Sequence, residues 1–207
     1  MKIAVIDYGA GNLNSVVKAL DRLGYPCAVT ESPQEVLDAP VVVCPGVGAA
    51  ADAMKRLREL HLDDAIREVI AADKPFLGIC LGLQLLLDVS NENGRHKCLG
   101  IIPGSVKKLP SGLKVPHMGW NQVRQTVKHP IFEGVPDGSN FYFVHSYYGA
   151  PDDGSVVAGE TGYGVTFASS LIKGNMVATQ FHPEKSGAMG LKLLDNFLKW
   201  SSKGGDR

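Results

Sequence analysis

Short apolar segments alternate with amphipathic segments in the N-terminal part of the chain, and this pattern restricts the fold more than any other feature. The apolar runs cover residues 2–7, 27–30, 40–44 and 75–80. Apolar residues spaced three or four apart predict helices over residues 12–23, 50–60, 62–72 and 81–89. Alternation of this kind predicts a largely parallel sheet with helices on both faces, and therefore an α/β fold.

The pattern changes after residue 98, where short alternating segments are separated by Gly, Pro and Asp. These segments predict strands of antiparallel hairpins at residues 105–109, 122–127, 141–145, 156–160, 165–171 and 176–180. A last amphipathic helix is expected over residues 187–200. The polar end, residues 203–207, is expected to be frayed.

Length and composition limit the classes of protein. A chain of 207 residues, 44% of them hydrophobic, suits one compact domain. Its 21 basic and 21 acidic side chains balance, which argues against nucleic acid as the main partner. No apolar run approaches the ~20 residues that span a bilayer, and the start lacks a signal-peptide pattern, so we expect a cytoplasmic protein that does not bind membranes. The four cysteines form no CxxC pair, and we expect neither a metal nor another cofactor.

One cysteine has the sequence context of a nucleophile. Gly78 to Gly82 has the form G-x-C-x-G, where a buried strand turns abruptly into a helix, and Cys80 is at its centre. Such a turn presents the sulfur to a substrate, and the start of the following helix favours the thiolate. The alternative is a buried cysteine in a tight turn, which is our interpretation of Cys27, Cys44 and Cys98.

The base is predicted at the end of the last apolar strand. His182-Pro183-Glu184 follows residues 176–181, and strand ends of this kind meet at one edge of an open α/β sheet. A Cys80–His182–Glu184 triad is therefore reasonable, with Glu184 fixing the tautomer of the imidazole. His145 also ends a strand and ranks second as the base, because no carboxylate follows it closely. By context His61, His96, His117 and His129 look like loop or surface residues.

A second glycine-flanked segment fits an oxyanion hole. Acyl transfer needs two donors, and the backbone N–H of Leu81 supplies the first. Gly46, Val47 and Gly48 follow the third apolar strand and could supply the second. Because glycines allow the peptide to rotate, we hypothesise that the Gly46–Val47 N–H turns inward only when a partner is bound. A plain turn is the alternative.

Together these segments resemble the class I (triad) glutamine amidotransferases, with the motifs in the family's order and the resemblance extending from residue 3 to about residue 200. Within the family the chain looks most similar to glutaminase subunits of histidine biosynthesis. Four segments carry that similarity: residues 7–13 (DYGAGNL), 115–121 (VPHMGWN), 141–148 (FYFVHSYY) and 182–187 (HPEKSG).

The resemblance implies a flavodoxin-like open twisted mixed sheet with helices on both faces, and residues 1–207 as a single domain. It also implies glutamine as substrate, and ammonia passed to a separate (βα)8-barrel cyclase subunit in a heterodimer. The residues that would hold the α-groups of glutamine are Gln84, Glu92, Ser146 and Tyr147. Those that would contact the partner are Asn12, Met118, Trp120, Tyr142 and Lys185.

Three other interpretations stay open at this point. The chain could be the glutaminase subunit of another synthase, such as pyridoxal phosphate synthase. It could be a cysteine peptidase or stress protein on a related fold, although the His-Pro-Glu segment near the C-terminus disfavours this. It could also be a non-catalytic module that regulates a partner, which the intact triad disfavours.

Overall fold

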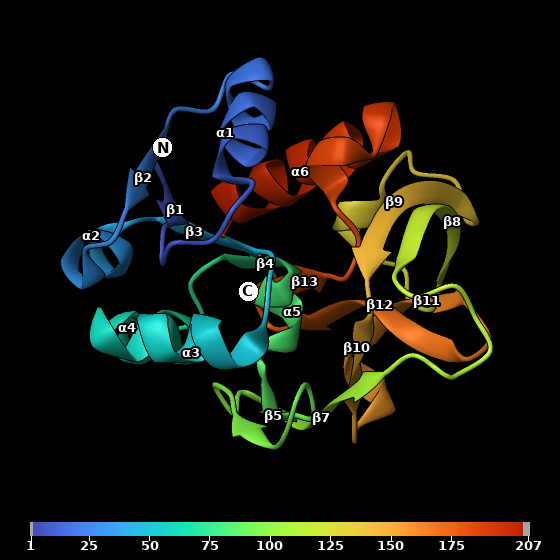
Figure 1. Ribbon diagram of the computed structural model, residues 1–207. Coiled ribbons are helices and arrows are strands. Elements are labelled where there is room, and N and C mark those ends of the chain that lie inside the picture. Colours follow the sequence, from blue (N-terminus) through green and yellow to red (C-terminus); the bar gives the residue numbers. More distant parts are fainter. Residues whose placement is uncertain (1, 205–207) are drawn as a thin grey trace.

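The computed structural model describes residues 2–204 and has two sheets, with helices on both faces of the larger one (Figure 1). The predicted frayed end lies mostly outside the described residues; within them, α6 reaches Ser202 and the chain turns at Gly204. No helix in the described part of the chain is both long and apolar enough to cross a membrane.

The larger sheet has nine strands in the order β2-β1-β3-β4-β13-β12-β11-β8-β9. The first five strands in that order are parallel, and the strands that follow pair antiparallel. Their bounds are β1 Ile3–Ile6, β2 Cys27–Thr30, β3 Val41–Gly46, β4 Phe76–Cys80, β8 His117–Gln125, β9 Ser139–His145, β11 Val157–Gly162, β12 Thr166–Lys173 and β13 Met176–Thr179. The predicted mixed open sheet is confirmed.

Alternate residues of the central strands face different helix layers. Ile3 and Val5 point to one face, where they pack with α1 (Leu13–Arg22) and α6 (Gly187–Ser202). Ala4 and Ile6 point to the other face, covered by α2 (Pro33–Asp38), α3 (Ala50–Glu59) and α4 (Leu62–Ala71). Both faces are buried, which is why these strands read as continuous apolar runs.

A second sheet was not predicted. Its four strands run in the order β10-β7-β5-β6, with β5 Leu87–Ser90, β6 His96–Lys97, β7 Ile102–Lys108 and β10 Tyr147–Pro151. The helix predicted over residues 81–89 is wrong: α5 covers only Leu81–Gln84, and β5 follows almost at once. Within residues 2–204 there are also three 3-10 helices, η1 Pro130–Phe132, η2 Gly154–Val156 and η3 Pro183–Lys185.

Candidate active site

Cys80 is the last residue of β4 and lies at the sharp turn into α5. Its φ of 54° and ψ of −103° place a non-glycine residue in a backbone conformation that is rarely occupied, as in a nucleophile elbow. The two flanking glycines permit close packing: a Cβ on Gly82 would collide with the carbonyl of Cys44, and one on Gly78 would lie 2.9 Å from the carbonyl of Gly82. The turn is therefore compatible with glycine at both positions and with little else.

The sulfur of Cys80 faces a pocket whose opposite wall includes Val144, Ser146 and Tyr147. The thiol lies 3.9 Å from the carbonyl oxygen of Val144, and the Gln180 amide donates to it at 3.7 Å. Because α5 is only four residues long, its dipole contributes little to the thiolate. The activation of the thiol must come from neighbouring side chains.

His182 and Glu184 form a buried pair beside Cys80. Nδ1 of His182 donates to Oε1 of Glu184 at 2.8 Å, and the side chains are 1% and 0% exposed. The same oxygen accepts a second hydrogen bond from Nδ2 of Asn12, also at 2.8 Å. Nε2 of His182 is buried, and the Cys80 thiol interacts with this imidazole. His182 is thus placed as a base that could activate the thiol, and Glu184 as the group that orients it.

The pKa of His182 is shifted in the direction opposite to the one that burial favours. Burial alone would lower the pKa of His182, but the Cys80 thiol and the Glu184 carboxylate outweigh burial and raise the pKa to about 10. An imidazolium is therefore favoured next to this sulfur. Burial raises the pKa of Cys44 to about 12 and that of Cys98 to about 11, so both stay protonated, as their interpretation as small buried residues requires. All four cysteines are free thiols.

The segment predicted as the oxyanion loop runs along the same pocket. Gly46 still belongs to β3 and pairs with Cys80 in the register of β3 and β4, whereas Val47 and Gly48 leave the strand and line the pocket with Leu81. Gly48 has a φ of +101°, which only glycine adopts readily. The buried hydroxyl of Tyr8 packs directly against Gly46 and fills the space that a side chain there would need.

Three of the four residues predicted to bind glutamine, Gln84, Glu92 and Tyr147, form hydrogen bonds within the protein. Gln84 donates from Nε2 to the carbonyl of Tyr147 at 2.8 Å and to Gln180 Oε1 at 3.1 Å. Oε2 of Glu92 accepts from the N–H of Ala50 at 2.9 Å and so caps the start of α3. Ser146 lines the same pocket as Gln84, Glu92 and Tyr147.

The hydrogen bonds of His145 favour His182 over His145 as the base. Its Nδ1 lies 2.9 Å from the carbonyl of Tyr147 and its Nε2 lies 2.9 Å from Nδ1 of His117, so both ring nitrogens have partners. The interpretation of His117 as a loop or surface residue is wrong: it begins β8 and is 4% exposed. Its neighbours Pro116 and Gly119 are typical of turns, which suggested a loop.

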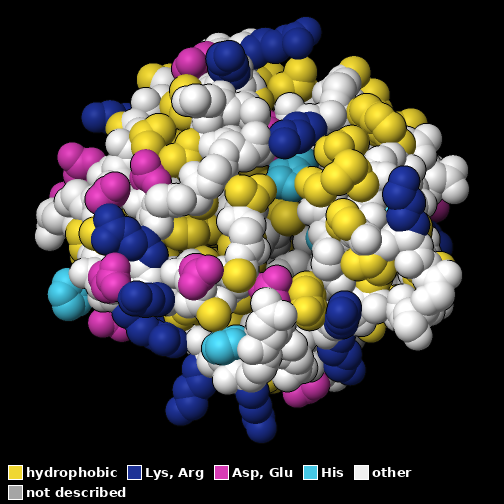
Figure 2. Space-filling view, in the orientation of Figure 1, with side chains coloured by type: hydrophobic (Ala, Val, Ile, Leu, Met, Phe, Trp, Pro, Cys, Tyr) yellow, Lys and Arg dark blue, Asp and Glu magenta, His cyan; other side chains and the backbone are white. Residues whose placement is uncertain are grey.

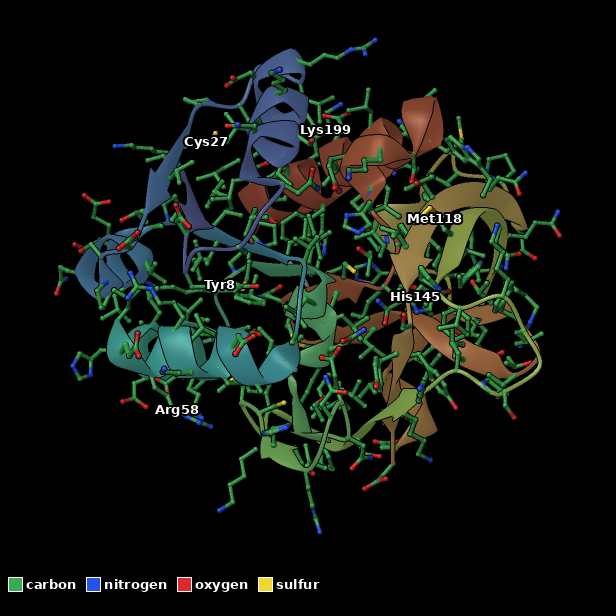
Figure 3. All side chains as sticks on the ribbon, viewed as in Figure 1. Tyr8, Cys27, Arg58, Met118, His145 and Lys199 are labelled. Atoms are coloured by element: carbon green, nitrogen blue, oxygen red, sulfur yellow. The ribbon has the colours of Figure 1, made fainter. Side chains whose placement is uncertain are left out.

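The five residues predicted to contact a partner lie around the outer side of the triad. Met118 and Trp120 on β8 are 61% and 58% exposed, and Trp120 packs edge-on against Tyr142 on β9, at 6.1 Å between ring centroids. Figure 3 labels Met118 at this hairpin. Asn12 bonds to Glu184, and the side chain of the next residue, Lys185, is exposed. The carboxylate of the predicted triad therefore lies directly beneath this surface.

Two contributions were missed in the sequence. Gln180 belongs to an apolar segment, yet its amide contacts both Cys80 and Gln84. A buried amide two residues before a candidate base was the only available signal. Asn12 was predicted at a partner surface, but its bond to Glu184 joins residues 172 positions apart and no local pattern indicates it.

Comparison with known proteins agrees with this geometry. The family model of the class I glutamine amidotransferases matches residues 4–200. The chain therefore belongs to the class I glutamine amidotransferase family, and it is a glutamine amidotransferase enzyme.

Its relatives define the group within that family. The imidazole glycerol phosphate synthase subunit HisH of Dehalococcoides mccartyi strain CBDB1 is 55% identical over 95% of this chain and 96% of its own length. That of Moorella thermoacetica is 57% identical over 94% and 93%. At this identity over nearly full lengths, the function is that of the glutaminase subunit of imidazole glycerol phosphate synthase.

Solved structures are similar in fold. A glutamine amidotransferase from Thermotoga maritima superposes with a TM-score of 0.67 at 19% identity, covering 100% of this chain and 86% of its own. PurLQS from the same organism gives 0.76 at 17% identity, covering 96% and 98%. At such low identity these likenesses concern the fold alone.

Proposed function

We propose that Cys80, His182 and Glu184 hydrolyse the side-chain amide of L-glutamine, and that the ammonia passes to a separate (βα)8-barrel cyclase subunit. That subunit would use the ammonia to make imidazole glycerol phosphate and an aminoimidazole carboxamide ribotide. The observation that carries the proposal is the buried His182–Glu184 pair beside a thiol at a strained elbow that opens into a pocket.

In the first step the Cys80 thiolate attacks the side-chain amide carbon of glutamine. A carbon–sulfur bond forms, and the carbonyl electrons move to oxygen, where the N–H of Leu81 and the Gly46–Gly48 loop stabilise the charge. The imidazolium of His182 gives its proton to the amide nitrogen, the carbon–nitrogen bond breaks, and ammonia leaves. The product is a thioester on Cys80.

In the second step water attacks the thioester. His182 takes a proton from the water, the carbon–oxygen bond forms, and the carbon–sulfur bond breaks with the electrons returning to sulfur. Glutamate leaves and the thiolate–imidazolium pair is restored. Glu184 holds Nδ1–H of His182 throughout, so that Nε2 faces the reacting atoms.

The need for a partner follows from the product. Ammonia released into water at neutral pH becomes mostly ammonium, which is not a nucleophile, so it must pass to the next site without equilibrating. The exposed pair Met118 and Trp120, with Asn12, Tyr142 and Lys185, supplies a surface next to the triad for such a partner.

Glutamine hydrolysis by the purified chain tests the proposal, measured alone and with a cyclase subunit plus its nucleotide ligand. We expect low activity alone, strong activation in the complex, and loss of both in Cys80→Ala. Absence of Cys80-dependent hydrolysis in every mixture would contradict the assigned nucleophile. High activity of the free chain would be consistent with the triad, but it would contradict the hypothesis that the Gly46–Val47 N–H turns inward only when the partner is bound.

A further inference from the structure

Four polar groups form a continuous chain of hydrogen bonds beside the pocket. Nδ2 of Asn121 lies 3.3 Å from Nε2 of His117, Nδ1 of His117 lies 2.9 Å from Nε2 of His145, and Nδ1 of His145 lies 2.9 Å from the carbonyl oxygen of Tyr147. His117 and His145 lie opposite each other on β8 and β9. We call these four groups the histidine relay.

The two ends of the relay determine where its protons lie. The carbonyl of Tyr147 can only accept, so Nδ1 of His145 donates and its Nε2 accepts when the ring is neutral. Nδ1 of His117 must then donate to it, and Nε2 of His117 accepts from the amide of Asn121. Every nitrogen is satisfied only if both imidazoles are neutral and both carry their proton on Nδ1.

The surroundings of the relay favour this neutral state. His117 is stacked between Phe143 and Tyr163, with ring centroids at 5.0 Å and 4.0 Å. His145 packs edge-on against Phe167 at 5.1 Å. Burial lowers the pKa of both imidazoles, that of His145 to about 4. The relay is therefore an ordered set of dipoles rather than a charged pair.

The relay ends at the wall of the pocket. The carbonyl of Tyr147 accepts from both His145 and Gln84, which fixes the backbone at Ser146–Tyr147 from two sides. Gln84 also contacts Gln180, whose amide reaches the sulfur of Cys80. One network therefore joins the pocket wall to the nucleophile.

We propose that His117 and His145 are positioning residues, whose relay holds the Tyr147 carbonyl and the Ser146–Tyr147 backbone in the position that binds the α-groups of glutamine. The inference rests on the proposed function, because it assumes that glutamine occupies this pocket. Neither imidazole contacts the reacting atoms, so the relay acts on substrate binding rather than on the chemical step.

Two substitutions at one position separate the two bonds of His145. His145→Gln keeps a polar group near the position of Nε2 but leaves the Tyr147 carbonyl to Gln84 alone. His145→Asn keeps a donor near the position of Nδ1 and loses the contact with His117. We expect His145→Gln to raise KM for glutamine about tenfold with little change in kcat, the size of one lost hydrogen bond, and His145→Asn to raise it less. His61→Asn, on an exposed turn, is the control for substitution of a histidine.

Labelling of Cys80 gives a second measurement. In His145→Gln, inactivation by a glutamine-shaped electrophile should slow about tenfold, because it needs the same pocket wall. Alkylation by iodoacetamide, which does not use that wall, should keep the wild-type rate if the nucleophile is unchanged. Equal slowing of both reagents would mean that the elbow itself is disturbed, and would overturn a role in positioning the substrate.

Nitrogen NMR of the wild-type protein tests the relay without any substrate. Both rings should show a protonated Nδ1 and an unprotonated Nε2 at neutral pH, and a protonated Nε2 on either ring would overturn the relay. If the wild-type protein hydrolyses glutamine but His145→Gln has the wild-type KM, the positioning role of the relay is overturned and the proposed function is kept. Absence of Cys80-dependent hydrolysis in the wild type would overturn the proposed function, and with it the role in binding glutamine.

Discussion

At the scale of single residues, the orientation of His182 depends on a carboxylate that is itself held in place. Oε1 of Glu184 accepts from both His182 and Asn12, whereas Oε2 is buried and forms no hydrogen bond with any described residue. A carboxylate with one free oxygen can rotate unless the other is fixed. Asn12 is therefore expected to keep Glu184 aligned with the imidazole.

Removal of the Asn12 amide should reduce turnover. Asn12 has a φ of 74°, so Asn12→Gly removes the side chain without straining the backbone. A hydrogen bond to a charged group contributes about 1.5–3 kcal/mol, so we expect kcat for glutamine hydrolysis in the complex to fall by about tenfold or more. His61→Gly is the matched control, since His61 also begins a helix with positive φ. Full turnover in Asn12→Gly would show that Glu184 needs no second donor.

His145 should make the stability of the protein depend on pH. Its pKa is lowered by burial to about 4, so below pH 6.5 the unfolded chain binds a proton that the folded protein does not. The free energy of unfolding therefore falls as pH drops from 6.5 towards 4, and is unaffected by this group above 6.5. Between pH 7.5 and 5 the loss from His145 should be about 2 kcal/mol.

Urea unfolding at these two pH values measures that loss. His145→Asn cannot titrate and should show a smaller decrease than the wild type. His61→Asn, at an exposed turn whose φ of 56° asparagine tolerates, should keep the wild-type decrease. An equal decrease in the wild type and His145→Asn would mean that His145 is protonated in the folded state.

At the scale of elements, the strands of the larger sheet were predictable and the second sheet was not. Each central strand has its own apolar run, so the sequence alone indicates it. Residues 85–87 are three consecutive leucines that fit a buried helix equally well. Their carbonyls instead accept from the backbone of residues 99–102, and this pairing, which brings β5 beside β7, depends on contacts that no local pattern contains.

The candidate site divides in the same way. Cys80, His182, Glu184 and the Gly46–Gly48 segment lie in contiguous motifs and could be read directly. Gln180 contacts Cys80 only after β4 and β13 have come together, and the histidine relay forms only after β8 has paired with β9. Burial and pairing therefore had to be known first.

Packing of the elbow against β3 should make Gly82 irreplaceable. The carbonyl of Cys44 lies where the Cβ of Gly82→Ala would go, and as backbone inside β3 it cannot move aside easily. Overpacking of this kind costs about 1–3 kcal/mol, so we expect this loss in the free energy of unfolding, together with lower glutaminase activity. Gly154→Ala is the control, because it is exposed and has open space around its Cα. Equal stability of the two variants would contradict the close packing of the elbow on β3.

At the scale of the whole molecule, charged and apolar surfaces are separated. Charged side chains of both signs cover the helices α2, α3 and α4, whereas apolar side chains gather over β8 and β9 beside the central hollow (Figure 2). Met118 and Trp120 are large hydrophobic residues exposed on β8, Val115 is exposed just before it, and Val47 is exposed in the loop that lines the pocket. Asn12 contacts Glu184 and lies on the same side of the molecule as Met118 and Trp120. A partner bound to this surface would therefore cover the predicted triad and meet the ammonia where it forms.

Trp120 should be the energetic centre of that contact. It is 58% exposed and held edge-on by Tyr142, so it presents a large rigid apolar surface at little cost in side-chain entropy. Trp120→Ala should weaken binding of the cyclase subunit by about 2 kcal/mol or more, at least thirtyfold in Kd by calorimetry, and reduce activation of the glutaminase to the same extent at limiting partner.

Val29→Ala, which is 46% exposed on the edge strand β2, should leave Kd unchanged. Because Trp120 is exposed, its removal should not lower the unfolding temperature, so a loss of affinity would report the interface itself. Unchanged affinity in Trp120→Ala would move the docking surface away from β8, and the ammonia would then have to leave the pocket by a side other than the one on which Asn12, Tyr142 and Lys185 lie.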